Sequence, residues 1–424
     1  MWTDRYSQRH GVDMNVEAKI SSSHTSEILI VGGGLTGLVL AAALGGAGVD
    51  VAVVDPIPKV KFLNPKFDGR TTAISAGSRA ALDVIGAWKY MVGQASEILE
   101  IRVSDTRSPL FLHFDHADLK AGPLGYIVEN QKIRAALFKS LENLSTVKLR
   151  FGQHVQLLNY DNQFISAETD YGDVLSARLV IAADGRASPM RKLANISVRQ
   201  WRYLQTGIVC TVEHEYSHGG VAQEHFLPAG PFAILPMTKN RSSIVWTEKE
   251  SLAPKILSLS NEAFTEELKL RFGNYLGDLK VIGPIFSHPL GLLHADTYIL
   301  PRLALAGDAA HAIHPIAGQG LNLGIRDAAV LAEIIINALR LGLDAGSMNV
   351  LEEYQRWRRF DNTMMVATTD GLNRLFSNDI APLKVARDLG LAMVNNTPPL
   401  KQLCMRHAMG LLGDLPKLIR GEKI

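Results

Sequence analysis

Residues 28–37 read ILIVGGGLTG, an apolar run that leads into a glycine-rich turn. The apolar run predicts a buried strand, and the stretch LVLAAAL at 38–44 predicts a buried helix. A second apolar run, VAVV at 51–54, ends on Asp55. Strand, glycine turn, helix and strand form a βαβ unit, so this part of the chain predicts an α/β fold with a parallel sheet.

The glycines of this turn have the spacing of a dinucleotide-binding motif. Gly32, Gly34 and Gly37 satisfy G-x-G-x-x-G, and Asp55 follows 18 residues after Gly37. The first glycine makes the tight turn, the second lets a pyrophosphate approach the backbone, and the third lets the helix pack close to the strand. Thr36 lies at the start of the helix, whose N-terminus attracts phosphate. The Asp55 carboxylate can accept hydrogen bonds from ribose hydroxyls, but the motif alone does not separate FAD from NAD.

A second glycine-rich loop, far along the chain, favours FAD. Residues 303–306 read LALA, a buried-strand pattern, and Asp308 follows. An NAD enzyme needs no second ligand loop so distant from its dinucleotide motif, whereas FAD carries a ribityl chain and a tricyclic ring. Asp308 can hold the ribityl or the pyrophosphate-side hydroxyls, and the helix predicted at 321–341 can stabilise negative charge on reduced flavin. The candidate cofactor contacts in this loop are Pro315, Gly318, Gly320, Leu321 and Asn322.

Four short motifs together resemble one family of flavoproteins. They are DGRTTAIS at 68–75, VIAADG at 180–185, HPIAGQGLNLGIRD at 314–327 and TDGLNRLF at 369–376. On these residues the chain is similar to the class A flavoprotein aromatic hydroxylases, which have the para-hydroxybenzoate hydroxylase type of fold. More narrowly, it resembles the ubiquinone-biosynthesis ring hydroxylases, whose signature the third motif matches throughout. Asp55 departs from the family pattern, because Glu is commoner at that position.

The resemblance implies an FAD-dependent monooxygenase. In that family reduced FAD reacts with O2 to form a flavin hydroperoxide, which hydroxylates an electron-rich ring. In the ubiquinone subgroup the substrate is a prenylated phenol or benzoquinol, and the electrons come from NAD(P)H or a redox protein. Two alternatives stay open. One is a flavin-dependent reductase or oxidase of the same fold acting on a polyprenyl or aromatic substrate, and the other is a flavoprotein scaffold in a biosynthetic assembly.

The resemblance also suggests three further cofactor contacts. Arg70 is a candidate for a charge beside the flavin, with a surface salt bridge as the alternative. Asn130 lies in the stretch ENQ at 129–131, where many relatives place a flavin-contacting glutamine. Asp184 either contacts the cofactor or fixes a turn next to it.

Catalytic and substrate-binding residues are harder to identify, because the cofactor performs the difficult step. No metal site, nucleophile or acid–base pair is evident in the sequence. His311 and His314 are the candidates for deprotonating a phenol, and the alternative is that they shape the loop. Phe226, Phe232 and Leu235 would suit the wall of an apolar substrate pocket, but residues of this kind are also common in the core of a sheet.

The predicted organisation is an FAD-binding Rossmann-like domain with an inserted β-rich substrate domain and a helical C-terminus. Alternating polarity at 98–115 predicts an antiparallel hairpin, and a helix is predicted at 261–273. The predicted segments are a disordered lead-in at 1–26, an FAD-binding domain at 27–87, 124–195 and 291–345, a substrate domain at 88–123 and 196–290, and a helical region at 346–424.

Composition restricts partners and location. The 424 residues carry a net charge of +2, which argues against nucleic acid as a partner. Two cysteines suit a reducing cytoplasm. The uncharged stretch at 28–49 is long enough to cross a bilayer, but its strand and helix periods argue against a membrane span. Residues 381–424 hold seven Lys or Arg against three acidic residues, interleaved with apolar residues. This composition suits peripheral contact with the inner membrane surface or contact with a protein of a ubiquinone-biosynthesis assembly.

Overall fold

The computed structural model describes residues 24–64, 69–105, 111–119, 122–314, 318–376, 390 and 392–424. The predicted lead-in lies outside these residues except for its last three, which belong to the first strand. Among the described residues, no helix is long and apolar enough to cross a membrane. The uncharged stretch at 28–49 forms a strand, a turn and a helix, as predicted.

The first sheet carries the βαβ unit. Its strands follow the order β17-β18-β11-β1-β2-β8, and β10 and β9 extend it beyond β11. β1 pairs in parallel with β2 and β11, and β11 pairs in parallel with β18. The strands are β1 (His24–Val31), β2 (Val51–Asp55), β8 (Val147–Phe151), β9 (Val155–Tyr160), β10 (Ile165–Thr169), β11 (Val174–Ala182), β17 (Ile299–Leu300) and β18 (Leu303–Leu305).

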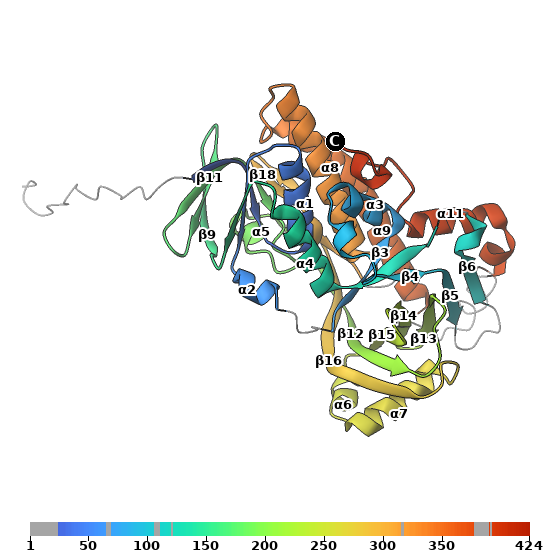
Figure 1. Ribbon diagram of the computed structural model, residues 1–424. Helices are drawn as coiled ribbons and strands as arrows, with labels where there is room; N and C mark the ends of the chain where they lie inside the picture. Colours follow the sequence, from blue (N-terminus) through green and yellow to red (C-terminus); the bar gives the residue numbers. More distant parts are fainter. Residues whose placement is uncertain are drawn as a thin grey trace, which may run out of the picture.

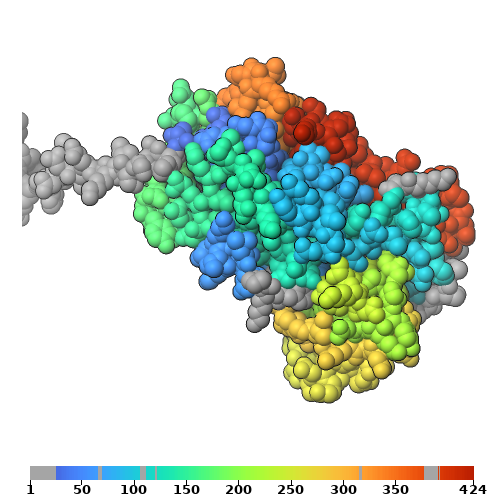
Figure 2. Space-filling view, in the orientation of Figure 1, coloured from blue at the N-terminus to red at the C-terminus, as the bar shows by residue number. Residues whose placement is uncertain are grey.

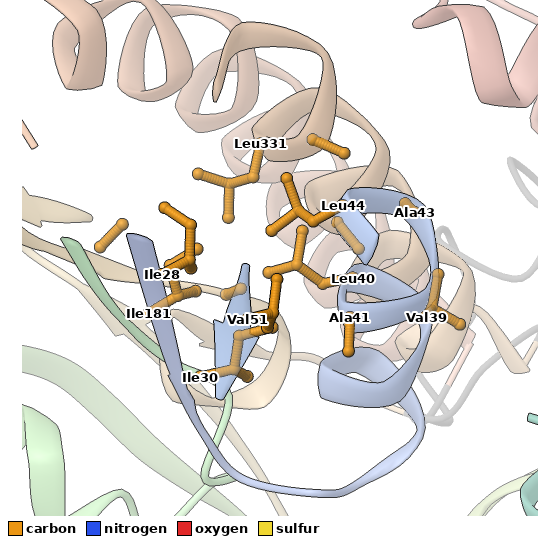
Figure 3. Packing of buried hydrophobic residues seen from close by; sticks show 14 of the residues in the cluster. Ile28, Ile30, Val39, Leu40, Ala41, Ala43, Leu44, Val51, Ile181 and Leu331 are labelled. Carbon is orange, nitrogen blue, oxygen red and sulfur yellow. The ribbon is translucent and has the colours of Figure 1, made fainter. Parts of the chain in front are cut away.

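Helices cover this sheet and complete its core. Helix α1 is buried on almost every side, as expected for a helix that is apolar all round. Its Leu40 and Leu44 point toward the strands and toward Leu331 of α8 (Figure 3), whereas Val39 faces away yet is only 1% exposed. The α-helices are α1 (Leu35–Gly46), α2 (Lys59–Phe62), α3 (Ala76–Val84), α4 (Asn130–Leu141), α5 (Pro189–Leu193), α6 (Ala253–Leu257), α7 (Asn261–Phe272), α8 (Gly320–Arg340), α9 (Met348–Phe376) and α11 (Pro398–Ala408).

The second sheet has the strand order β19-β16-β12-β15-β14-β13-β5-β6. One face packs on α6 and α7, which lie at the bottom of Figure 1, and we call it the outer face. On this face Ile208, Ile244 and Trp246 are at most 1% exposed. The opposite, inner face is turned toward the first sheet's loops and the C-terminal helices. The strands are β5 (Glu100–Asp105), β6 (Phe111–Asp115), β12 (Val198–His214), β13 (Val221–Leu227), β14 (Gly230–Met237), β15 (Arg241–Lys249), β16 (Leu279–Ala295) and β19 (His311–Ala312).

A three-stranded sheet lies between the two larger ones. It consists of β3 (Thr71–Ser75), β7 (Gly125–Glu129) and β4 (Ser96–Ile98), in the order β3-β7-β4. Thr71 Oγ1 donates a hydrogen bond to Ser243 Oγ on β15 over 2.9 Å. This bond ties the start of β3 to the inner face of the second sheet.

The main predicted elements are confirmed. The hairpin expected at 98–115 is formed by β5 and β6, and the expected long helices are α7 and α8. The mixed α/β architecture and the helical C-terminus are also confirmed. The antiparallel meander β9–β10–β11 was not predicted. We propose the predicted division into an FAD-binding and a substrate domain, which follows the two large sheets with two exceptions. β4 pairs with β7, and β19 and the end of β16, which lie in the predicted FAD-binding segment 291–345, belong to the second sheet.

The C-terminal segment turns back onto the first domain after α11. The Gly77 N–H donates to the Met409 carbonyl over 3.0 Å. Arg326 donates to two backbone carbonyls of the segment over 3.0 and 2.9 Å. Leu418 and Ile419 are 2% and 3% exposed. Figure 2 shows this segment in red beside the light-blue region that contains α3. Its apolar residues therefore contribute to the fold's own core.

A buried ion network joins α8, α9 and the loop before β19. The Asp327 carboxylate lies 2.6 Å from His311 Nε2, and accepts hydrogen bonds from Arg358 Nε at 2.7 Å and from the Gly307 N–H at 2.9 Å. Arg358 also donates to Asn362 Oδ1 over 2.7 Å. Burial by itself would raise the pKa of Asp327, but His311 and Arg358 outweigh it and hold the pKa far below its usual value. The carboxylate is therefore charged and fully compensated.

Replacing Arg358 with methionine should strongly destabilise the protein. Arg358→Met leaves the buried Asp327 charge without its guanidinium partner, and such a loss costs about 3–5 kcal/mol. Urea unfolding at saturating FAD would measure the change, with Arg356→Met, an exposed residue of the same helix, as the control. A loss equal to that of the control would show that the network does not hold these elements together.

Candidate functional site

The glycine turn between β1 and α1 has the close approaches that its spacing predicts. Gly32 has φ +115°, and a Cβ there would lie 2.3 Å from the Ala183 carbonyl oxygen. A Cβ on Gly37 would lie 1.9 Å from the Gly32 carbonyl oxygen. Gly34 differs, because no atom lies within 4 Å of an added Cβ. Two of the glycines therefore build the turn, and the third faces open space.

The N-terminus of α1 faces the same space. No side chain in the described part of the chain caps it, and its first turn contains no acidic residue. The first N–H groups of a helix have no partner within the helix and carry partial positive charge. An anionic pyrophosphate fits this position, and the open space at Gly34 gives it access to the backbone.

Asp55 is held beside the turn by two backbone donors. Its Oδ2 accepts from the Gly33 N–H over 2.7 Å, and its Oδ1 accepts from the Ile57 N–H over 2.8 Å. Burial raises the pKa of Asp55 against the effect of these two hydrogen bonds. Each carboxylate oxygen has a second lone pair that can accept from a ribose hydroxyl.

Thr36 brings the two glycine-rich loops together. A Cβ on Gly307 or Gly324 would lie 3.0 or 2.5 Å from Thr36 Oγ1, so only glycine allows α1 to approach α8 this closely. Asp308 follows Gly307 at the end of β18, and its side chain is exposed. The surrounding protein partly desolvates the Asp308 carboxyl group, and this desolvation raises its pKa above the usual value. Asp308 is thus available to a ligand beside the glycine turn. The Thr36 side chain packs against Gly307 and Gly324, and its predicted contact with the cofactor stays a prediction.

The start of α8 forms the far end of the candidate site. No side chain of the described residues caps this helix, and its first turn contains no acidic residue. Gly320 has no atom within 4 Å of an added Cβ, and Leu321 beside it is half-buried. Gly318 has φ +61°, and its added Cβ would lie 3.2 Å from Ala73 Cβ. Pro315 lies outside the described residues. A flat ring can approach the backbone at Gly320, just as a phosphate can at Gly34.

Asn322 holds β3 beside this loop. Its Oδ1 accepts from the Ser75 N–H over 3.0 Å, and its Nδ2 donates to the Ala73 carbonyl over 2.9 Å. Both ends of the amide are therefore engaged by the backbone of β3. The side chain positions the loop, and its predicted direct contact with the cofactor stays a prediction.

Asp184, Arg70 and Asn130 surround the same region. Asp184 accepts from Ser188 Oγ over 2.6 Å and from the Met190 N–H over 2.9 Å, so it fixes the turn into α5. Burial raises its pKa. Arg70 is exposed, and its carbonyl accepts from the Asn130 N–H over 2.9 Å. The Asp184 geometry matches the alternative expectation, in which this residue acts through a turn.

Gln131 is a candidate contact that the sequence did not single out. Asn130 Oδ1 already accepts from Thr72 Oγ1 over 2.6 Å. The Oε1 of Gln131 is buried and accepts no hydrogen bond from the described residues, while its Nε2 donates to Glu129. The neighbouring glutamine thus offers the cofactor a vacant acceptor. The ENQ stretch marked this place, but the choice between adjacent amides needed three-dimensional contacts.

His311 and His314 differ in their surroundings. His311 is 2% exposed and its Nε2 is occupied by Asp327, which favours the structural alternative for this residue. His314 is fully buried, with its ring edge-to-face against Tyr203 at 5.1 Å between centroids. Burial lowers the pKa of His314 to about 4, although Asp370 opposes the effect. His314 is therefore neutral near pH 7.

The three predicted pocket residues lie on opposite faces of the second sheet. Phe232 is fully buried on the outer face and packs against Trp246, so it belongs to the sheet core and not to a pocket wall. The reason is strand geometry, since residues 232 and 235 on β14 point to opposite faces. Phe226 and Leu235 lie on the inner face, in an apolar cluster that also contains Ala73.

Helix α9 reaches from the buried ion network to this inner face. Near its start Arg358 binds Asp327, and at its end Phe376 stacks on Phe226 with ring centroids 4.0 Å apart. Asn373 is 3% exposed. The end of α9 and the inner face therefore border one apolar region next to Ala73. Ala73 in turn lies against Gly318 in the glycine-rich loop before α8, which we call the flavin loop.

Gly34 and Gly37 allow a sharp test of the cofactor site. Gly34→Val places its side chain in open space, so the apo-protein should unfold at nearly the same temperature while FAD binds at least about tenfold more weakly. Gly37→Val collides with the Gly32 carbonyl and should destabilise the apo-protein itself. Thermal unfolding of apo-protein and fluorescence titration with FAD separate the two effects. Normal FAD affinity in Gly34→Val would contradict the assignment.

Comparison with known proteins identifies the family of this chain. The FAD binding domain family matches residues 25–369. The chain is 50% identical to the ubiquinone hydroxylase UbiL of Rhodospirillum rubrum, across 95% of this chain and 94% of that protein. It is 36% identical to the 3-demethoxyubiquinol 3-hydroxylase of Escherichia coli, across 92% of this chain and 100% of that protein.

Solved structures share the fold at lower identity. The p-nitrophenol 4-monooxygenase PnpA of Pseudomonas putida has a TM-score of 0.78 at 22% identity, covering 92% of this chain and 99% of its own. PqsL of Pseudomonas aeruginosa has a TM-score of 0.72 at 22% identity, covering 84% of this chain and 97% of its own. Given the family match and the two relatives above, the chain belongs to the FAD binding domain family and, within it, to the ubiquinone hydroxylases.

Proposed function

We propose that this protein uses FAD to hydroxylate the aromatic ring of a prenylated phenol or benzoquinol on the route to ubiquinone. The observation that carries the proposal is the meeting of two uncapped helix N-termini, at Gly34 and Gly320, opposite an apolar sheet face. The two helix N-termini suit a long anionic dinucleotide, and the apolar sheet face suits an apolar ring substrate. The names of the relatives supply the pathway.

The residues present fit FAD, and each part of the cofactor has a matching group. The α1 N-terminus at Gly34 would hold the pyrophosphate, and Asp55 would hold the ribose. Asp308 would hold the ribityl chain, and the α8 N-terminus at Gly320 would face the ring. FAD, when bound, supplies the redox chemistry that activates O2. The balanced reaction takes two electrons from the donor and two protons, places one oxygen atom of O2 on the ring and releases the other as water. A hydride from NAD(P)H brings both electrons and one proton, and solvent supplies the second proton. With a redox protein as the donor, solvent supplies both protons.

The chain's own contribution is to orient the ring and keep water out. Apolar residues of the inner face and of the end of α9 form a continuous cluster there, which includes Phe226, Leu235 and Phe376. Water exclusion protects the activated oxygen from being lost as hydrogen peroxide. The neutral His314 at the edge of the loop adds no charge to this region.

Contact with a membrane surface or with an assembly partner is a separate part of the proposal. Met405, Met409, Leu418 and Ile419 of the C-terminal segment are buried in the fold, but Met393 and Leu403 are 64% and 52% exposed. Arg406 is exposed one helical turn after Leu403. This arrangement supports weak peripheral binding to an anionic surface, from which a polyprenyl substrate could enter.

Sedimentation with vesicles tests the surface contact. The wild-type protein should sediment with anionic phospholipid vesicles, and Met393→Ser/Leu403→Ser should sediment several-fold less because two apolar contacts are lost. The exposed pair Leu341→Ser/Leu343→Ser, at the end of α8, is the matched control. Equal sedimentation of all three proteins would contradict the placement of the contact at Met393 and Leu403.

Isotope labelling tests the proposed reaction. The FAD-loaded protein, with NAD(P)H or a chemical reductant and a geranyl-substituted phenol under 18O2, should give a product that gains one 18O atom on the ring. Oxygen uptake should match product formation, because one O2 is used for each ring hydroxylated. Mass spectrometry and an oxygen electrode measure the two quantities.

The alternative functions predict other outcomes in the same experiment. A reductase would change the substrate without incorporating 18O, and an oxidase would release hydrogen peroxide in place of a hydroxylated product. FAD retained without any turnover, across several prenylated phenols and both kinds of electron donor, would favour a scaffold. The Gly34→Val protein is the negative control for flavin-independent chemistry.

A further inference from the structure

A row of side chains crosses the inner face of the second sheet and contains a single polar residue. The strand pairings align one residue from each of six neighbouring strands. In order across the sheet these residues are Val103, Glu224, Ala233, Val245, Val209 and Phe286. Apart from Ala233, all of them are half-buried, whereas the adjacent outer-face residues of β12, β14 and β15 are almost fully buried. The row therefore borders accessible space.

This row faces the cofactor side of the molecule. At one end the ring of Phe286 packs so closely on Gly69 that an added Cβ would lie 2.0 Å away. Near the other end, Ala222 and Phe226 precede and follow Glu224 on the same face of β13. Both belong to the apolar cluster that includes Ala73, which contacts the flavin loop. Glu224 thus lies between apolar neighbours in the region assigned to the substrate.

The carboxyl group of Glu224 stands alone in these surroundings. Within the part of the chain that the structure describes, it makes no hydrogen bond and no ion pair. Other acidic residues nearby are paired, as Glu129 is with Arg241 at 3.0 Å and Glu100 with Arg102 at 2.8 Å. Burial raises the pKa of Glu224 to about 8, so the neutral acid predominates near pH 7. A neutral carboxyl group can both donate and accept a hydrogen bond.

We propose that Glu224 binds an oxygen substituent of the substrate's aromatic ring and so selects ring substrates that carry one. A polar group without a partner in an apolar site is unfavourable, and a ligand that satisfies it gains specificity. A prenyl tail has no atom that can hydrogen-bond to a carboxyl group, whereas a phenol or quinol ring has several. The inference deepens the proposed function and rests on it.

Two substitutions separate this contact from a structural contribution. Glu224→Gln keeps a neutral hydrogen-bonding group of similar shape, and Glu224→Leu removes hydrogen bonding while keeping the volume apolar. Glu213→Leu makes the same chemical change at an exposed position of β12 and serves as the matched control. FAD content and unfolding temperature establish that each protein is folded.

The probes are a geranyl-substituted phenol and the same compound without its hydroxyl group. Each is titrated into FAD-loaded protein and followed by the change in flavin absorbance. Wild type, Glu224→Gln and Glu213→Leu should prefer the phenol by about tenfold, the effect of one hydrogen bond to a buried group. Glu224→Leu should bind both compounds about equally and retain its FAD.

The outcomes distinguish this inference from the proposed function. If Glu224→Leu keeps the wild-type preference while wild type still hydroxylates the phenol, the inference is wrong and the function stands. A similar loss of preference in Glu213→Leu would also overturn it, because the effect would then be non-specific. If wild type binds neither compound and hydroxylates none, the proposed function fails, and this inference fails with it.

Discussion

The Asp327 carboxylate is the point at which three distant parts of the chain meet. It accepts the Gly307 N–H, and it binds His311 and Arg358. A buried charge is tolerated only when its partners are in place, so α8, α9 and the loop that carries Asp308 must form together. Asp308, which would face the ribityl chain, directly follows Gly307. Its position therefore depends on the Asp327 ion pair, whose carboxylate holds the Gly307 N–H.

The sequence predicted the part of the site that depends on local spacing. Gly32, Gly34 and Gly37 follow one another within a single turn. Their spacing alone indicates that Gly32 and Gly37 must allow close backbone packing and that Gly34 must leave space for a ligand. The second loop was found in the same way, because a buried strand followed by Gly307 and Asp308 is a local pattern. Resemblance to a known family then supplied the identity of the cofactor and the expected class of substrate.

The remaining features depend on partners that are distant in sequence. Nothing near Asp327 or Arg358 indicates that they pair, and the helical pattern alone would place an arginine in solvent. Phe232 was assigned to the pocket with Leu235, although the odd separation places them on opposite faces of β14. Counting strand parity would have corrected that assignment. The isolation of Glu224 is visible only when six strands are aligned side by side.

Helix α9 contacts the ion network at Arg358 and the substrate sheet at Phe376, and 18 residues separate them (376 − 358 = 18). At about 3.6 residues per turn this is about five whole turns, so both side chains leave the same side of the helix. One inserted or deleted residue would rotate the far end by about 100° and turn Phe376 away from Phe226. The two contacts therefore constrain the length of the segment between them, which can change only in steps that preserve the helical phase.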